Sequence, residues 1–221
     1  MSRLRHVSST SDIHKHLGIL RRRNKHLAKA IKAAGLPGLR KMQPGFATLI
    51  RIIVDQQVSV AAGASIWAKL EAACNGEVTS DGLLKLSKPG LRACGFSGQK
   101  ACYALGVAEV TKAGELDFDA LETMDDAAVR SALIALKGVG PWTVDIYLMF
   151  GMGRPDVWPV GDLVIQNSAR ALLGLRKRPS AERLTKLGDD WKPYRSSAAL
   201  LLWHYWHHLA ENAKAAKGTK G

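Results

Sequence analysis

The chain has 221 residues, which is enough for one domain or two small lobes with a buried core. Apolar residues make up 47% and charged residues 23%, a balance typical of a globular protein and not of a disordered one. Thirty-two Lys and Arg against nineteen Asp and Glu give a formal net charge of +13. So basic a chain favours a nucleic-acid partner over a merely soluble basic protein.

Cysteine and histidine spacing indicates no metal site. Cys74, Cys94 and Cys102 fit no disulfide or metal framework and are expected to be small buried apolar residues of a reducing compartment. His204 and His208 lie one helical turn apart, but no third zinc ligand is evident. No run is long enough to span a membrane, and no secretory signal opens the chain. We therefore expect an intracellular protein without membrane contact, in the cytoplasm or nucleoid of a bacterium or the nucleus of a eukaryote.

Apolar residues at helical spacing predict a first helix from about Ser11 until Gly35 and Pro37 end the pattern. The opposite face is basic and is either a solvated surface or one that faces DNA; it carries Arg21, Arg22, Arg23, Lys25 and Lys29. A second helix is expected to begin at Pro44 and to be interrupted by Gln56-Gln57. Ser59 can cap the next one.

The middle of the chain predicts short helices around 83–86 and 91–94 and a longer one over about 97–112. Asp125 or Asp126 can cap a helix that ends at Leu136. The segment that follows, Leu136–Thr143, reads Leu-Lys-Gly-Val-Gly-Pro-Trp-Thr. Two glycines around one apolar residue suit a tight turn between helices, and Pro141 can open the next helix.

A further helix is expected to begin at Asp162 and run to Leu173, and a last one to begin at Pro193. No stretch alternates apolar and polar residues as a half-buried strand would. The sequence therefore predicts an all-α chain.

The glycine-rich turn and Asp162 together suggest chemistry on a nucleic acid. A turn of this kind leaves backbone N–H groups at a helix N-terminus, where an anion can bind. In so basic a chain the obvious anion is a nucleic-acid phosphate. Asp162, twenty-two residues after Gly140, is then a candidate for chemistry on the bound strand.

The turn and the segment Val160–Gln166 resemble the helix-hairpin-helix DNA glycosylases, which carry a Gly/Pro-rich loop and a catalytic aspartate. The closest likeness is to the branch of 3-methyladenine DNA glycosylase II, the AlkA type. A Gly-x-Gly turn alone is weakly specific, but Trp142, Gln56-Gln57-Val58-Ser59 and Pro193-Tyr194-Arg195-Ser196 strengthen the match. The likeness runs from about residue 44 to about residue 207.

The resemblance implies a two-lobed, all-α helix-hairpin-helix glycosylase fold. One lobe would comprise residues 44–156, and the other would combine residues 1–43 with residues 157–221. Hairpin and aspartate would face a cleft between the lobes.

The resemblance also implies an enzyme that flips an alkylated purine, such as 3-methyladenine or 7-methylguanine, out of duplex DNA and hydrolyses its N-glycosidic bond. Asp162 would stabilise the sugar cation; its position alone favours a helix N-cap, and the matched hairpin favours catalysis instead. Relatives that also cut the backbone carry a lysine where this chain has Trp142, and Lys137 lies within the turn instead. We therefore expect a monofunctional glycosylase, without lyase activity, that leaves an abasic site.

The implied base pocket consists of Trp142, Trp203, Ile146 and Leu163. An electron-rich indole attracts a cationic alkylated base, whereas the alternative for either tryptophan is core packing. Some relatives place aromatic residues where this chain has Ile146 and Leu163, so a broad substrate range is in doubt.

Further contacts follow from the same resemblance. The DNA-binding hairpin would consist of Leu136, Lys137, Gly138, Val139, Gly140 and Thr143, reinforced by a Na⁺ or K⁺ ion on the carbonyls of Ile134, Leu136 and Val139. Gln57 would be the wedge that fills the gap left by the flipped base, or else it pairs with nearby backbone. No cofactor is required, and no iron–sulfur loop can form because no cysteine follows Cys102. The partner would be double-stranded DNA with alkylated bases, bound by a monomer.

Two alternatives stay open from the sequence. A protein of this fold could act on another lesion, such as a mismatched adenine, although the iron–sulfur cysteines usual in that group are missing. It could also recognise damage without catalysis, although Asp162 is present. The exact lesion range is not readable from the sequence.

Overall fold

The computed structural model describes residues 6–218, and within that range it contains twelve α-helices, one short π-helical segment and no strand. The predicted all-α class is confirmed. The chain forms two compact units: a middle unit, Met42–Met152, and a terminal unit that combines Met1–Lys41 with Gly153–Gly221. None of the helices in the described range has the length and apolar character needed to cross a membrane.

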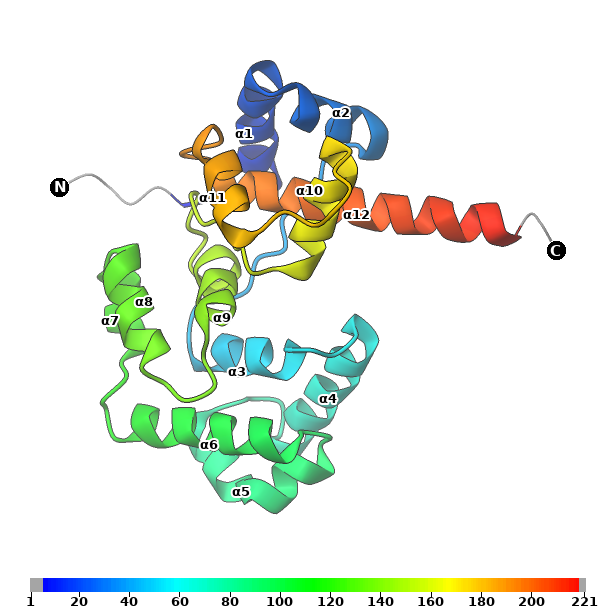
Figure 1. Cartoon of the computed structure of the whole chain (residues 1–221). Coiled ribbons are helices and arrows are strands. Elements are labelled where there is room, and N and C mark those ends of the chain that lie inside the picture. The colour runs from blue at the N-terminus through cyan, green and yellow to red at the C-terminus, as the bar shows by residue number, and fades with distance from the viewer. Residues whose placement is uncertain (1–5, 219–221) are drawn as a thin grey trace. The chain divides into compact units, whose positions relative to one another are not determined.

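The terminal unit is built around its last helix, which packs against the first two helices and α10 (Figure 1). Fully buried leucines from these helices form its core, among them Leu17, Leu27, Leu201 and Leu202. Figure 1 shows the C-terminal part of α12 extending beyond the other helices of this unit. The helices are α1 (Thr10–Arg23), α2 (Lys25–Ala34), α10 (Leu163–Leu173), α11 (Ala181–Asp189) and α12 (Arg195–Gly218).

The expected single N-terminal helix is wrong, because Asn24 divides it into α1 and α2. Asn24 adopts an extended backbone (φ −135°, ψ 111°), and its side chain accepts hydrogen bonds from the N–H groups of His26 and Leu27. An asparagine that caps the following helix in this way satisfies two donors that a continuous helix would satisfy internally. The basic residues therefore lie on two consecutive helices.

The middle unit holds the remaining helices. They are α3 (Phe46–Asp55), α4 (Val60–Ala73), α5 (Ser80–Ala93), α6 (Gly98–Lys112), α7 (Phe118–Thr123), α8 (Asp126–Ile134) and α9 (Pro141–Ile146), with the π segment η1 (Tyr147–Gly151). Ser59 caps α4 and Asp125, one of the two candidates, caps α8, as predicted. Ser97 caps α6, whose predicted range of about 97–112 is confirmed. The two short helices expected around residues 83–86 and 91–94 are confirmed, because α5 consists of two helical segments separated by the non-helical backbone of Ser87 (φ 54°, ψ −176°).

The end of the middle unit is fastened to its beginning. The buried hydroxyl of Tyr147 accepts a hydrogen bond from the Gly45 N–H (2.9 Å), and the Met42 N–H donates to the Phe150 carbonyl (2.9 Å). Burial raises the pKa of Tyr147 to about 12, so this phenol stays neutral at physiological pH. Both ends of the continuous segment 42–152 therefore meet at one place.

Candidate active site

The glycine-rich turn joins α8 to α9, as predicted, but α8 ends at Ile134, two residues before the expected Leu136. Gly138 has φ +87°, a backbone conformation that favours glycine, and Pro141 occupies the first turn of α9. The Val139 N–H donates to the Leu136 carbonyl at 3.1 Å.

Tyr103 of α6 gives a second reason for glycine at position 138. A Cβ atom on Gly138 would lie 2.1 Å from Cδ2 of the Tyr103 ring. The ring therefore packs directly against the backbone of the turn, and any side chain at this position would displace it.

Gln56 and Lys100 tie the turn to the end of α3. The Gln56 Nε2 donates to the Gly138 carbonyl (3.1 Å) and to the Thr143 Oγ1 (2.9 Å). The Lys100 Nζ donates to the carbonyls of Val54 (2.7 Å) and Gln56 (2.5 Å). Burial lowers the pKa of Lys100, and the nearby carboxylate of Asp55 opposes that shift. We call Gln56 and Lys100 the hairpin clamp.

Gln57 follows directly after the clamp, in the break between α3 and α4. Its φ is +54° and its side chain is exposed. The glutamine that pairs with backbone is its neighbour Gln56, and the wedge role of Gln57 stays a prediction. Gln57 lines an open pocket of 430 Å³, together with Gln56, Ser97, Gln99, Lys100, Tyr103, Gly138, Val139 and Gly140.

Sequence analysis did not find three of these residues, Gln56 in its clamp role, Lys100 and Tyr103. The sequence left open whether a glutamine at this break pairs with nearby backbone, and in the structure Gln56 does so. Nothing local to positions 100 and 103 marks them, because each contacts segments more than thirty residues away in sequence.

The other predicted residues of the middle unit lie close to the turn in sequence and differ in exposure. Trp142 is half-buried at the start of α9, Ile146 is buried and Lys137 is exposed. An ion pair between Arg130 and the mostly buried Asp145 (2.6 Å) joins α8 to α9 and fixes the angle between them.

In the terminal unit, Asp162 and Trp203 come together although forty-one residues separate them. Asp162 is 8% exposed. Its Oδ1 accepts a hydrogen bond from the Ile165 N–H (2.8 Å) and one from the Trp203 Nε1–H (3.0 Å). The aspartate is therefore the N-cap of α10, and the indole holds the same carboxylate from α12. Leu163, the next residue, is 59% exposed.

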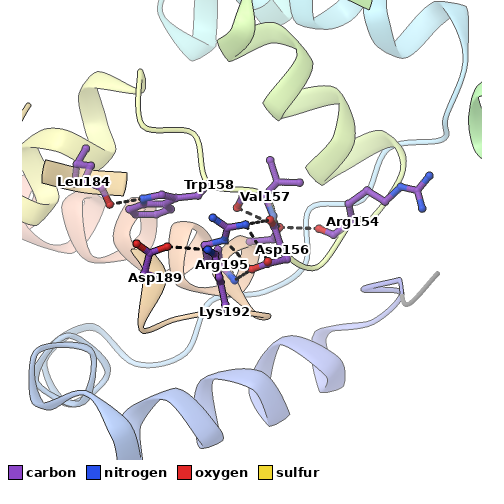
Figure 2. A network of polar contacts seen from close by, with 9 residues as sticks. Arg154, Asp156, Val157, Trp158, Leu184, Asp189, Lys192 and Arg195 are labelled. Atoms are coloured by element: carbon purple, nitrogen blue, oxygen red, sulfur yellow. Dashed lines mark hydrogen bonds and ion pairs between the residues drawn. The ribbon is translucent and has the colours of Figure 1, made fainter. Parts of the chain in front are cut away.

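A polar network fastens the loop that leads to Asp162 onto the start of α12 (Figure 2). The Arg195 guanidinium makes a two-pronged ion pair with the Asp156 carboxylate, at 2.8 and 2.9 Å. The Ser196 Oγ donates to the Arg154 carbonyl (2.6 Å) and accepts from the Val157 N–H (3.0 Å). Arg195 and Ser196 belong to the Pro193–Ser196 motif, whose role here is to hold this loop.

Trp158 anchors the same loop to α11. Its Nε1 donates to the Leu184 carbonyl (2.7 Å), and its ring packs edge-on against Trp191, with centroids 5.0 Å apart. A Cβ on Gly188 would lie 2.6 Å from the Trp158 ring, so glycine is required there.

A hydrogen bond also joins α10 to α12. The Ser168 Oγ, on α10, donates to the Leu202 carbonyl (2.7 Å) on α12, next to Trp203. Both helices that carry the Asp162–Trp203 pair are thus fixed to each other.

The predicted base pocket draws on both units. Trp142 and Ile146 belong to the middle unit, and Trp203 and Leu163 belong to the terminal unit. The pocket that would combine the four, and the cleft that would hold it, stay predictions.

The monovalent cation expected on the carbonyls of Ile134, Leu136 and Val139 stays a prediction. The Leu136 oxygen accepts one hydrogen bond, from the Val139 N–H. Cys94 is buried as expected, whereas Cys74 is half-buried and Cys102 is exposed. Within residues 6–218, no group of three or more His, Cys, Asp or Glu side chains is arranged to hold a metal ion.

Comparisons with known proteins identify the family. The family model described as HhH-GPD superfamily base excision DNA repair protein matches residues 50–193. The chain is 32% identical to the alkylbase DNA glycosidase-like protein mag2 of Schizosaccharomyces pombe, over 86% of this chain and 90% of that protein. It is 35% identical to the putative DNA-3-methyladenine glycosylase YfjP of Bacillus subtilis, over 55% of this chain, but spans only 42% of that relative's length.

A solved structure shows the same fold. The 3-methyladenine DNA glycosylase Mag1 of S. pombe, in complex with abasic DNA, superposes with a TM-score of 0.79 at 29% identity, covering 87% of this chain and 95% of that one. The family match covers more than half of the chain and includes the turn, the clamp and Asp162. The chain belongs to the HhH-GPD superfamily of base excision DNA repair proteins.

Proposed function

We propose that the protein is a DNA glycosylase that excises alkylated purines from duplex DNA and begins base excision repair. The observation that carries this proposal is the buried Asp162 carboxylate, whose Oδ1 is held by the Ile165 N–H and the Trp203 indole. The names of the relatives, which are glycosylases of 3-methyladenine or alkylated bases, support the substrate class.

The chemistry follows from what a fixed carboxylate does near a sugar. An alkylated purine such as 3-methyladenine is cationic and already a good leaving group, so the reaction needs little help from a general acid. As the N-glycosidic bond breaks, positive charge develops on the sugar. The Asp162 carboxylate stabilises that charge and orients or deprotonates the attacking water. The products are the free base and an abasic site.

Trp203 and Trp142 would recognise the flipped base. An indole face attracts a cationic ring by about 0.5–2 kcal/mol, and a neutral undamaged purine lacks this attraction. Ile146 and Leu163 would complete the pocket with apolar side chains. Because neither is aromatic, we expect a preference for cationic lesions over neutral ones.

The hairpin would hold the DNA backbone while the base is out of the duplex. Gly138 and Gly140 would donate their N–H groups to a phosphate, and Leu136, Lys137, Val139 and Thr143 would flank it. A Na⁺ or K⁺ ion on the carbonyls of Ile134, Leu136 and Val139 would add positive charge there. Gln57 would fill the gap in the duplex and hydrogen-bond the orphaned partner base. We expect the protein to act as a monomer.

The enzyme would be monofunctional because Trp142 occupies the position of the lysine that forms a Schiff base in lyase relatives. An indole cannot act as an amine nucleophile. Borohydride should therefore trap no covalent enzyme–DNA complex, and the strand should break only after alkali or heat.

The experiment that tests the proposal is mass-spectrometric identification of the bases released from methylated duplex DNA. We expect 3-methyladenine and 7-methylguanine from the wild-type chain and almost none from Asp162→Asn. Binding without any released base would favour a damage-recognition protein. Release of adenine from a mismatched duplex, with none from methylated DNA, would favour a glycosylase for a different lesion.

A further inference from the structure

Charge is divided very unequally between the two units. The terminal unit carries 23 Lys and Arg against 7 Asp and Glu, whereas the middle unit carries 9 against 12. Their formal net charges are therefore +16 and −3. The hairpin lies in the unit with the small negative charge, so the hairpin cannot account for the basicity of the chain.

The excess is concentrated where α1 meets α2, the consecutive helices at the N-terminal end of the terminal unit (Figure 1). Six side chains there are exposed, and we call them the α1–α2 basic edge: Arg21, Arg22, Arg23, Lys25, Lys29 and Lys32. None of the six is in an ion pair with another residue of the described range, 6–218. No acidic residue occurs in the sequence between Asp12 and Asp55.

Helix stability does not explain this arrangement. Arginines in the last turn of α1 suit the negative end of its dipole, but Lys25 lies at the positive end of α2, where a cation is unfavourable. Lys25, Lys29 and Lys32 repeat at spacings of four and three residues, so like charges neighbour one another along one face. The three lysines therefore do not favour the α2 helix, and the edge is more easily understood as a binding surface.

The side chains of the edge are suited to bind a polyanion through its charge alone. Between Arg21 and Lys32 there is no Phe, Tyr or Trp on which an exposed base could stack, and His26 is half-buried. Leu17, Leu20 and Leu27 are fully buried. Ile19 and Ile31 are half-buried, so the two helices expose no continuous apolar face that could enter a lipid bilayer. Duplex DNA is the polyanion on which this family acts, and its phosphates are spaced densely enough to contact several cations at once.

We propose that the α1–α2 basic edge is a second, lesion-independent contact with the phosphates of duplex DNA. This proposal depends on the proposed function only in assuming that duplex DNA is the substrate. It supplies affinity for undamaged DNA, on which the protein must search before any base is flipped, while the hairpin and Asp162 act at the lesion.

The test compares two triple variants that remove the same charge from exposed helical positions. Arg22→Gln, Lys25→Gln and Lys29→Gln together alter the edge. Lys69→Gln, Lys85→Gln and Lys88→Gln together alter α4 and α5 of the middle unit, where all three lysines are exposed. Fluorescence anisotropy on an undamaged duplex gives Kd over a salt series, and circular dichroism verifies that each variant is folded.

We expect the slope of log Kd against log salt to fall by about 2 to 3 for the edge variant, because each lost phosphate contact removes about 0.9. The middle-unit variant should keep a slope close to that of the wild type. Equal slopes for the two variants would overturn the proposal, because the net charge of the protein, and not the position of the edge, would then explain its affinity for DNA. Loss of binding to phosphatidylserine vesicles, with duplex binding retained, would overturn it in favour of a membrane. The assay involves no base release, so its outcome is independent of whether the chain excises methylated bases.

Discussion

Asp162 serves two purposes that a single substitution can separate. Asparagine can still accept the Ile165 N–H, so Asp162→Asn should retain the cap and the fold. The negative charge is lost, however, and loss of a comparable electrostatic group costs roughly two to three orders of magnitude in rate. Single-turnover excision from a methylated duplex measures the loss, and a titration on an abasic analogue should show binding that is intact or tighter.

The chain contains a matched control for this variant. Asp125 caps α8 with the same geometry, because its Oδ1 accepts the Ala128 N–H at 2.8 Å. Asp125→Asn should excise at the wild-type rate. If Asp162→Asn also excises at that rate, Asp162 is only a cap and the catalytic assignment is wrong.

Trp203 combines a ring that can stack with a base and an N–H that holds Asp162. Trp203→Phe keeps an aromatic ring but removes the N–H that donates to the Asp162 carboxylate. We expect excision to be about tenfold slower, because one hydrogen bond to a charged group is lost. Trp203→Ala removes both and should cost a further 1–3 kcal/mol or so in stacking. Binding to undamaged duplex should change little in either variant. Parallel losses of excision and of undamaged-DNA binding would indicate that the indole is only core packing.

At the scale of elements, the hairpin clamp sets the distance between the turn and the Gln57 loop. Gln56→Ala removes two hydrogen bonds to the turn, and Lys100→Met frees the carbonyls at the end of α3. At about 1 kcal/mol for each hydrogen bond, excision from duplex DNA should fall roughly tenfold or more. Excision from single-stranded DNA should fall much less, because no gap needs to be filled there.

The control is Gln43→Ala, which alters an exposed glutamine of the same unit and should leave both rates unchanged. Equal losses on both substrates would mean that the clamp only stabilises the fold.

The two glycines of the turn are predicted to respond differently to the same substitution. Gly138→Ala would be strained by φ +87° and would collide with Tyr103, and strain of this kind costs about 1–3 kcal/mol even without the collision. Gly140 has φ −97° and no atom within 4 Å of an added Cβ. Thermal denaturation should therefore show a lower Tm for Gly138→Ala and a nearly unchanged Tm for Gly140→Ala. A Tm for Gly138→Ala equal to that of the wild type would contradict this packing.

For the whole molecule, the net charge of +13 predicts binding that depends strongly on salt. Each neutralised phosphate contributes about −0.9 to the log–log slope, so a fourfold rise in salt weakens binding roughly 3.5-fold for each contact. Several contacts together should make undamaged-duplex affinity fall by orders of magnitude between low and physiological salt. An affinity nearly independent of salt would contradict the phosphate contacts of both the hairpin and the basic edge.

Local chemistry made the ends of several elements predictable. Side-chain caps at Ser59, Ser97, Asp125 and Asp162 place four helix starts where the sequence predicts them. The break at Asn24 is not predictable in this way, because the apolar spacing continues across it and indicates one continuous helix. The six-residue α7 was missed because only Leu121 of its side chains is buried, and one apolar residue makes no periodic pattern.

The contacts within the candidate site are harder to predict than its residues. Asp162 and Trp203 were identified from motifs, but their hydrogen bond joins positions forty-one residues apart. Gln56 reaches the turn across eighty-two residues, and Lys100 reaches the end of α3 across forty-six. Periodicity and capping report only on neighbours within a few turns of a helix, so they carry no information on such pairings.

The discontinuous terminal unit also determines the order in which the protein can fold during synthesis. The middle unit is complete once Met152 has left the ribosome, and its two ends are already joined by the Met42–Phe150 hydrogen bond. Helices α1 and α2 are made before the middle unit, but they pack on α12, which is made after it. Helices α1 and α2 can pack on each other at once, but the apolar side chains that face α12 stay uncovered until α12 has been made. We expect the dense positive charge of α1 and α2 to keep this helix pair soluble during that interval.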